Sequence, residues 1–201
     1  MSNFTGSYTL DPTHTIIGFV ARHAMVTKVR GKFNEWDATI EIADTPADSN
    51  IEVVVKTASV DTGNADRDGH VRADDFFNSE EFPDMIFKAT DFNIDENGNG
   101  TLTGDLTIRE TTKSVTLDVE TEGIAEDPFG NTRVGFEAST KIDRTEFGLK
   151  FNAPLNTGGV LVSEQGTLEI AGAASKPAYV KPLKRSCWRI FSDSTTFSIA
   201  L

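Results

Sequence analysis

The side chains of this sequence that could do acid–base or metal chemistry are three histidines and two acidic pairs. His14, His23 and His70 have no partner at a metal-ligand spacing such as i, i+4. No nucleophile elbow, phosphate-binding loop or dinucleotide fingerprint occurs in the chain. The pairs Asp74-Asp75 and Glu80-Glu81 fall in a polar stretch, where solvated charge is the usual explanation. The sequence therefore assigns no catalytic residue, no metal ligand and no cofactor.

An acidic loop carries oxygen atoms at the spacing of calcium ligands. Asp95, Asn97 and Asn99 match positions one, three and five of an EF-hand loop, and a glycine follows at position six. Position twelve is Leu106, where a calcium loop needs a bidentate glutamate. A hairpin turn explains this stretch better than a calcium site.

Arginines gather near two segments of the chain. Arg22 and Arg30 lie around the end of the first long alternating segment, and Arg67 and Arg72 lie in an irregular segment. If the two segments meet at one rim, these side chains could hold an anionic group through charge-assisted hydrogen bonds. The alternative is an ordinary solvated surface.

The elements that position these groups are predicted to be strands, because apolar and polar residues alternate with a period of two along much of the sequence. Ile17, Phe19, Ala21 and His23 share one face of the first long segment. His23 on this apolar face is either a hydrogen-bonded core residue or a ligand contact. The alternation recurs in residues 51–56, 102–109, 115–120 and 134–142. Such one-sided alternation predicts an antiparallel sheet with one apolar and one solvated face.

Turn residues separate the alternating segments at the spacing of a meander. They occur at residues 44–46, 97–100, 127–130 and 156–159. A sheet with one apolar face must close on itself or pack against a second sheet. A barrel of about eight strands encloses side chains or one small ligand. We therefore predict an all-β protein that forms an antiparallel β-barrel of about eight strands.

Phenylalanine dominates the aromatic residues, with 14 Phe against 2 Tyr and 2 Trp. These rings carry no polar group, so they fill a core or line an apolar pocket. Residues 66–77 show no alternation, and a short helical segment is predicted near residues 70–77. Phe76, Phe77 and Phe82 would then cover one end of the barrel.

The balance of acidic and basic residues changes sign at residue 172. Residues 1–172 carry 14 Lys and Arg against 30 Asp and Glu, whereas residues 173–201 carry five basic residues and one acidic residue. An acidic body repels phosphate backbones, which argues against binding of nucleic acid. We expect residues 1–172 to form one domain, and residues 173–201 to be a basic tail that is linker, disordered or vector-derived.

Cysteine and hydropathy indicate the compartment. Cys187 is the only cysteine, so no intramolecular disulfide can form. The first residues lack the basic and apolar stretches of a secretory signal, and no stretch approaches 18 apolar residues. We expect a cytoplasmic protein, or a secreted one if a leader has been removed, without stable insertion into a membrane.

Several motifs in colinear order resemble those of the YceI-like family. They are YTLDPTHT at residues 8–15, VRGKF at 29–33, ASVDTGN at 58–64, RD at 67–68, DFF at 75–77, FP at 82–83, GDLTI at 104–108 and DRTEFG at 143–148. The resemblance covers residues 8–171. One departure follows GDLTI, where the family usually continues with His-Gly and this chain has Arg109-Glu110. The geometry of that turn is therefore expected to differ.

The resemblance implies a lipocalin-like barrel that binds a polyisoprenoid, such as a polyprenyl phosphate or an isoprenoid quinone, in its lumen. It also implies transport, storage or sequestration without catalysis, and a homodimer as one form of the protein. The predicted lumen residues are Ile17, Phe19, Ala21, His23, Phe33, Phe76, Phe77, Phe87, Leu106, Ile108 and Phe136. The predicted head-group residues are His23, Arg22, Arg30, Arg67 and Arg72.

Two other classes of function stay open at this point. The barrel could have a solid core and act as a stress-response interaction protein through its outer face or its basic tail. An enzyme acting on the bound isoprenoid would need a clustered acid–base pair. The acidic body favours a neutral head group unless the local arginines dominate.

Overall fold

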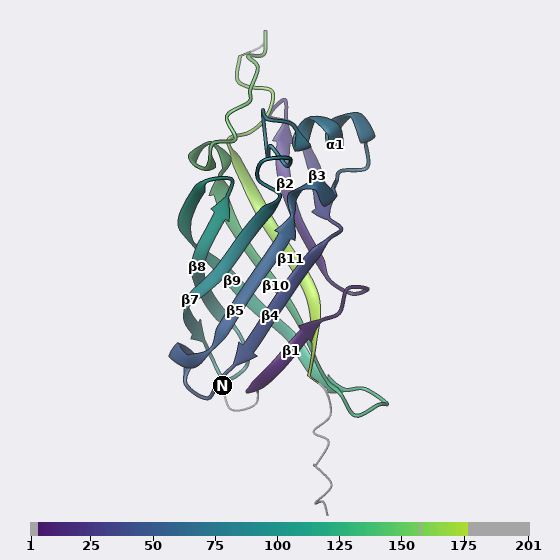
Figure 1. Ribbon diagram of the computed structural model, residues 1–201, viewed down its shortest axis with the longest axis vertical. Coiled ribbons are helices and arrows are strands. Elements are labelled where there is room, and N and C mark those ends of the chain that lie inside the picture. Colours follow the sequence, from purple (N-terminus) through teal and green to yellow (C-terminus); the bar gives the residue numbers. More distant parts are fainter. Residues whose placement is uncertain (1–3, 157, 177–201) are drawn as a thin grey trace, which may run out of the picture.

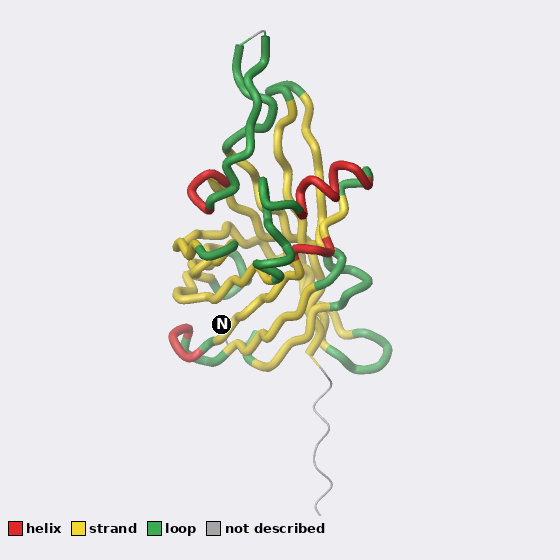
Figure 2. The backbone as a smooth tube through the Cα atoms, turned by 45° about the horizontal axis from the view of Figure 1, so that its top comes forward, coloured by secondary structure: helices red, strands yellow, loops and turns green. Residues whose placement is uncertain are grey.

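The computed structural model describes residues 4–156 and 158–176, and strands make up most of them (Figure 1). The strands are β1 (Gly6–Leu10), β2 (Ile16–His23), β3 (Thr27–Phe33), β4 (Trp36–Ile42), β5 (Asn50–Lys56), β6 (Val60–Asp61), β7 (Asp84–Ile94), β8 (Gly100–Ile108), β9 (Thr111–Glu126), β10 (Thr132–Asp143) and β11 (Gln165–Lys176). The helices are α1 (Ala65–Arg72) and three short 3-10 helices, Pro46–Asp48, Thr57–Ser59 and Arg144–Phe147. Figure 2 shows how small the helical parts are beside the strands.

Eight of the strands close into a ring. Their order is β1-β4-β5-β7-β8-β9-β10-β11, and β11 returns to β1 through the pairs Thr9–Ser175 and Leu10–Ala174. Strands β2, β3 and β6 extend the sheet from the other part of β11, where Thr167–Ala171 pairs with β2. All of the pairings are antiparallel. The predicted antiparallel β-barrel of about eight strands is confirmed.

The period of two decides which side chains enter the barrel. In β8, Leu102, Leu106 and Ile108 are buried, and the threonines between them lie nearer the solvent. Gly104 on the same strand leaves room for the ring of Phe87, since a Cβ atom at this glycine would lie 2.5 Å from that ring. The absent side chain thus lets a large ring lie across the strand.

The short helix lies earlier in the chain than the sequence indicated. Helix α1 spans Ala65–Arg72, so the predicted position near residues 70–77 was wrong except for its first three residues. The side-chain oxygen of Asn64 accepts a hydrogen bond from the backbone N–H of Arg67 at 2.9 Å and caps the helix. Asp66 and Asp68 in the first turn add favourable charge at this end.

The turns after α1 bring Phe76 and Phe77 into the barrel interior, where both are buried. Arg109 reaches the same turns from the β8–β9 hairpin, with its Nη1 atom 3.3 Å from the carbonyl oxygen of Phe76. Its guanidinium also lies 5.3 Å from the ring centre of Phe82. Arg109 has a φ of 55°, a left-handed conformation that suits glycine better. Arg109 thus connects the β8–β9 hairpin to the turns after α1, which cover this end of the barrel. We call the end that carries α1 the upper end.

The opposite end of the barrel is held by charged groups. Arg133 of β10 lies 2.8 Å from Asp11 and 3.1 Å from Asp127, measured between nitrogen and carboxylate oxygen. Hydrogen bonds from Asn131 and Arg133, among others, lower the pKa of Asp127 to about 2. These contacts connect the loop after β1 to the β9–β10 turn.

The last strand continues past the expected domain boundary at residue 172. Strand β11 runs to Lys176, and Ala173 to Lys176 pair with β10 along its first residues. Residues 177–201, most of the predicted basic tail, lie outside the described residues.

Candidate binding site in the barrel lumen

The interior of the barrel contains two cavities. The upper chamber, about 470 Å³, lies at the end that carries α1. The lower chamber, about 250 Å³, lies at the end where β1 begins. Small-molecule sites in proteins are typically about 300–1,000 Å³. The barrel interior is therefore not a solid core, and its two chambers together have the size of a ligand site.

The lower chamber is lined almost entirely by aliphatic and phenylalanine side chains from the inner faces of the strands. None of the residues that the structure places around it carries a full charge. Its main polar group is the hydroxyl of Tyr8, which is buried and has no hydrogen-bond partner among the described residues. Burial raises the pKa of this hydroxyl. The chamber suits a hydrocarbon chain.

The upper chamber combines an apolar wall with cations. Its charged or titratable lining residues are Arg22, His23, Asp66, Arg67, His70 and Arg144. Three of these are arginines and one is a carboxylate, although the whole chain has a formal net charge of −12. The two chambers therefore differ in polarity, and positive groups line the upper chamber only.

Arg144 is the buried cation of the upper chamber, with 9% of the residue exposed. Its guanidinium donates to the backbone carbonyls of Leu149, Ser163 and Val162. It lies 5.7 Å from the ring centre of Phe76. Burial lowers the pKa of Arg144, and the charges of nearby carboxylates oppose that effect. Arg144 thus holds together the segment that connects β10 to β11, and it also lines the upper chamber.

His70 of α1 packs into the same wall. Its ring lies edge-on to Phe151 at 4.6 Å and to Phe76 at 5.1 Å between ring centres. The Nε2 atom is 3.2 Å from a carboxylate oxygen of Asp75. This pair fixes the ring orientation at the covered end of the barrel, and both side chains are partly exposed.

The eleven lumen residues predicted from the sequence all line one of the two chambers. Ile17, Phe87, Leu106 and Phe136 line the lower chamber, Phe19, Ala21, His23, Phe76, Phe77 and Ile108 line the upper chamber, and Phe33 lines both. Their contact with a ligand stays a prediction. His23 lies at the exposed end of β2 rather than in the core.

The head-group residues predicted from the sequence separate into two sets. Arg22, His23 and Arg67 line the upper chamber. Arg30 does not, because it alternates with the inward-facing Val29 and instead borders an outer groove. Arg72 donates to the carbonyl oxygen of Ala58 at 3.3 Å, and it lines neither chamber. We therefore do not retain Arg30 and Arg72 as head-group residues.

Three of the lining residues that the sequence did not indicate matter most for the site. Met85 and Leu168 line both chambers, and Arg144 is the buried cation of the upper one. Met85 is the second residue of β7, a strand whose alternation is too irregular to recognise in the sequence. Arg144 belongs to the DRTEFG motif, which marked it as a family residue but not as a lining residue.

The acidic loop between β7 and β8 forms a hairpin turn. The Asp95 carboxylate accepts hydrogen bonds from the backbone N–H groups of Asn97 at 2.8 Å and Asn99 at 2.9 Å. In the described ranges, no three His, Cys, Asp or Glu side chains group in a way that could hold a metal ion. Within the same ranges, no helix has the length and hydropathy needed to cross a bilayer.

Comparison with known proteins gives consistent matches along the barrel. The model of the YceI-like domain family matches residues 8–174. A UPF0312 protein of Photorhabdus laumondii is 38% identical over 138 residues, which cover 68% of this chain and 71% of the relative. The Campylobacter jejuni YceI protein has a solved structure with a TM-score of 0.65 and 30% identity, covering 77% of this chain and 89% of the other.

A more distant likeness concerns the fold alone. A polyisoprenoid binding domain from Saccharophagus degradans is 15% identical, with a TM-score of 0.60 over 85% of this chain and 98% of that domain. The family match spans nearly the whole described barrel, from β1 into β11. This chain is a member of the YceI-like domain family.

Proposed function

We propose that this protein binds one long polyisoprenoid in its lumen and carries, stores or sequesters it without chemical conversion. The observation that carries the proposal is a hollow apolar barrel whose positive groups line one chamber only. An amphiphile with an apolar chain and one polar head group matches this division. The polyisoprenoid binding domain from Saccharophagus degradans, which shares the fold, supports the choice of chain.

The arginines of the upper chamber decide the orientation of the ligand in this proposal. Arg22, Arg67 and Arg144 outnumber Asp66 in the lining. Guanidinium groups bind phosphate more strongly than they bind neutral acceptors. We therefore place the head group in the upper chamber and favour a polyprenyl phosphate over an isoprenoid quinone. The chain then points toward the lower chamber.

The apolar chain supplies affinity but little selectivity. Each buried methylene group contributes about 0.8 kcal/mol, so a long chain approaches the observed ceiling of about 18–21 kcal/mol for non-covalent binding. The ordering of a flexible chain offsets part of this energy. Any long alkyl chain gains the same burial per carbon. Selectivity must therefore come from the head group and from the length that the lumen accepts.

Filling the upper chamber tests the proposal. Ala21 lines this chamber and pairs with Val29 of β3, whereas the adjacent Lys28 is exposed and lines neither chamber. We expect native mass spectrometry of freshly purified protein to show a bound polyisoprenoid, which solvent extraction removes. Ala21→Trp should abolish this species, since the indole occupies the space of the ligand. Lys28→Trp, which adds the same side chain on the outside, should retain it.

Protein that carries no extractable lipid and binds no added polyprenyl phosphate would contradict the proposal. Co-purification of a quinone instead would reject the phosphate head group and leave the carrier function in place. A cytoplasmic location and a homodimer belong to the same proposal. Cell fractionation and light scattering of the purified protein test them.

A further inference from the structure

The two chambers meet at a waist formed by three side chains. Phe33, Met85 and Leu168 are the residues that line both cavities among the described part of the chain. Met85 and Leu168 come from β7 and β11 of the ring, and Phe33 comes from β3 in the part of the sheet that extends the ring. Phe33 is 3% exposed and Met85 is 6% exposed. A chain that extends from the upper chamber into the lower one must pass these residues.

Phe33 is the fixed side of the waist. Its ring centre lies 5.8 Å from that of Phe19 and 5.7 Å from that of Phe77, which packs edge-on. Such aromatic contacts hold a ring in one orientation. The backbone of Phe33 pairs with Ile17 on β2 and with Val60 on β6, so the strand is held on both sides at this point.

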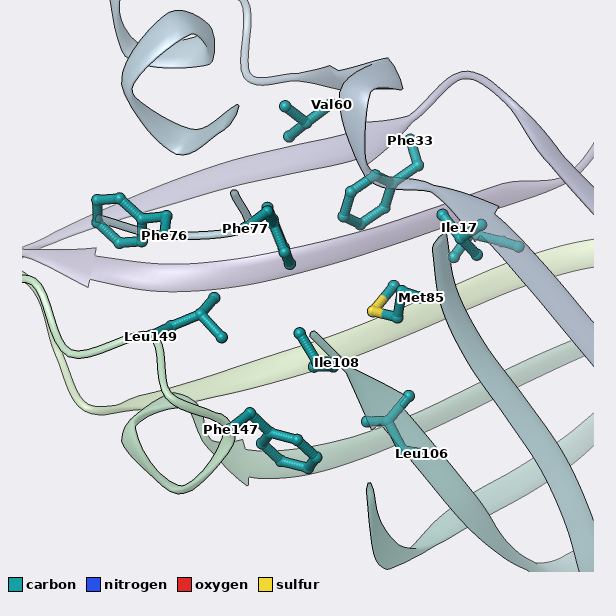
Figure 3. Packing of buried hydrophobic residues seen from close by; sticks show 11 residues of the cluster. Ile17, Phe33, Val60, Phe76, Phe77, Met85, Leu106, Ile108, Phe147 and Leu149 are labelled. Atoms are coloured by element: carbon teal, nitrogen blue, oxygen red, sulfur yellow. The ribbon is translucent and has the colours of Figure 1, made fainter. Parts of the chain in front are cut away.

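Met85 is the side of the waist that can move. Figure 3 shows its side chain with Phe33 and Ile17 on one side and Leu106 and Ile108 on the other. Methionine is unbranched and has three rotatable bonds, so it adapts to its surroundings more readily than the neighbouring rings and branched chains. Its displacement needs no movement of the wall.

The backbone beside Met85 is anchored. The N–H of Thr57 donates to the carbonyl oxygen of Pro83 at 2.9 Å, and the hydroxyl of Thr57 approaches the carbonyls of Phe82 and Pro83. Thr57 is 1% exposed. The start of β7 is therefore fixed, and at this point of the waist only the Met85 side chain is left to move.

The chamber volumes indicate how a short and a long chain would divide between them. The upper chamber, about 470 Å³, is nearly twice the size of the lower chamber, about 250 Å³. We expect a short prenyl phosphate, such as farnesyl phosphate, to lie in the upper chamber with its head group. A chain twice as long needs the lower chamber as well.

We infer that Met85 is a specificity-determining residue that sets which chain lengths gain affinity from the lumen. A chain of farnesyl length binds in the upper chamber while the waist stays closed. A longer chain displaces Met85 and enters the lower chamber. This inference rests on the proposed function, because it assumes that an isoprenoid enters from the end that carries α1.

The test compares farnesyl phosphate with hexaprenyl phosphate on the delipidated full-length protein. Met85→Trp closes the waist with a large, stiff side chain. We expect its affinity for hexaprenyl phosphate to fall by about tenfold or more, because the distal methylene groups lose their burial. Its affinity for farnesyl phosphate should fall by a clearly smaller factor, because Met85 borders the upper chamber only at the waist. Isothermal titration calorimetry measures both.

Matched variants separate the waist from general crowding. Ile108 lines the upper chamber only, so Ile108→Trp should weaken both probes. Met85→Ala removes the movable side chain, and it should speed the association of hexaprenyl phosphate more than that of farnesyl phosphate. This second variant decides the question if Met85→Trp fails to fold, as judged by circular dichroism.

The outcomes distinguish the two proposals. If wild-type protein binds neither phosphate, the proposed function fails. If it binds both, but Met85→Trp weakens them equally or leaves hexaprenyl phosphate unaffected, the role of Met85 is overturned. Unchanged association kinetics in Met85→Ala would overturn it as well.

Discussion

At the scale of single residues, Tyr8 is the clearest case of a group that folding leaves unsatisfied. Its hydroxyl is buried beside the lower chamber without a hydrogen-bond partner among the described residues. A buried polar group without a partner costs roughly 1–3 kcal/mol. The ring itself packs with Leu10, Val134 and Ala174 at the lower end of the barrel. The hydroxyl therefore destabilises a side chain whose ring stabilises the barrel.

Removing that hydroxyl should stabilise the lipid-free protein. We expect Tyr8→Phe to raise the free energy of unfolding by about 1 kcal/mol, because the ring packing remains and the desolvated group is gone. Urea denaturation of delipidated wild-type and variant protein measures the difference. A decrease of similar size would show that the hydroxyl has a partner, such as a bound water molecule, and would refute the prediction.

Whether the position of a site residue can be predicted from the sequence depends on whether it lies on a strand or in an irregular segment. The period of two indicates which residues of a strand face inward, and Phe19, Ala21 and Ile108, chosen in this way, line the upper chamber. Arg30 was assigned to the head-group site because it lies close to Arg22 in the sequence. Its place next to the inward-facing Val29 on β3 directs it outward instead. Arg144 was missed because its position depends on the carbonyl groups of Leu149, Val162 and Ser163 in the irregular segment that follows it, which no local pattern encodes.

At the scale of elements, α1 depends on its surroundings more than on its own sequence. It has eight residues, includes Gly69 and buries only Asp68. Isolated helices of this length are marginal in water. The carboxylate of Asp68 accepts hydrogen bonds from the N–H and hydroxyl of Thr62, and Arg67 donates to the same residue. Together with the Asn64 cap, these bonds hold the helix beside the upper chamber.

Loss of the cap should therefore loosen α1 without unfolding the barrel. We expect Asn64→Ala to destabilise the helix by about 1 kcal/mol, since the backbone N–H of Arg67 loses its acceptor. Hydrogen exchange should become faster in residues 65–72, while exchange in β8 and β10 stays unchanged. Unaltered exchange in the helix, or faster exchange throughout the barrel, would contradict this expectation.

Elements with strong periodicity were predictable, and the irregular ones were not. Strands β2, β8 and β10 followed from alternation, because one face of each is buried in the barrel. The helix was placed too late, since the apolar residues after Arg72 were given more weight than the cap at Asn64. The two-residue strand β6 is too short to carry any pattern.

At the scale of the whole molecule, the barrel depends on residues beyond the boundary that composition indicated. Ala174 and Ser175 form the pairs of β11 with β1 that complete the ring. Ala174 is also part of the apolar cluster at the lower end. The change in charge at residue 172 therefore does not coincide with the end of the fold.

Two truncations should separate the barrel from the segment that follows it. A chain ending at Lys176 should keep the melting temperature and the lipid binding of the full-length protein. A chain ending at Gly172 should lose several degrees or more of thermal stability, because the barrel no longer closes. Differential scanning calorimetry with native mass spectrometry measures both properties. Equal stability of the two chains would refute the role of the closing pairs, and loss of binding on removal of residues 177–201 alone would favour the interaction-protein alternative.

The pairing of β1 with β11 also has a consequence for how the chain folds during synthesis. The first strand and the last strand are neighbours, so the ring cannot form until nearly all of the described chain has left the ribosome. Contacts between such distant residues make folding slow, and they leave the apolar inner faces of the earlier strands exposed in the meantime. A hydrophobic molecule that is present at that stage can be enclosed as the ring closes. The order of synthesis then offers a route to the loaded protein that does not pass through the covered end.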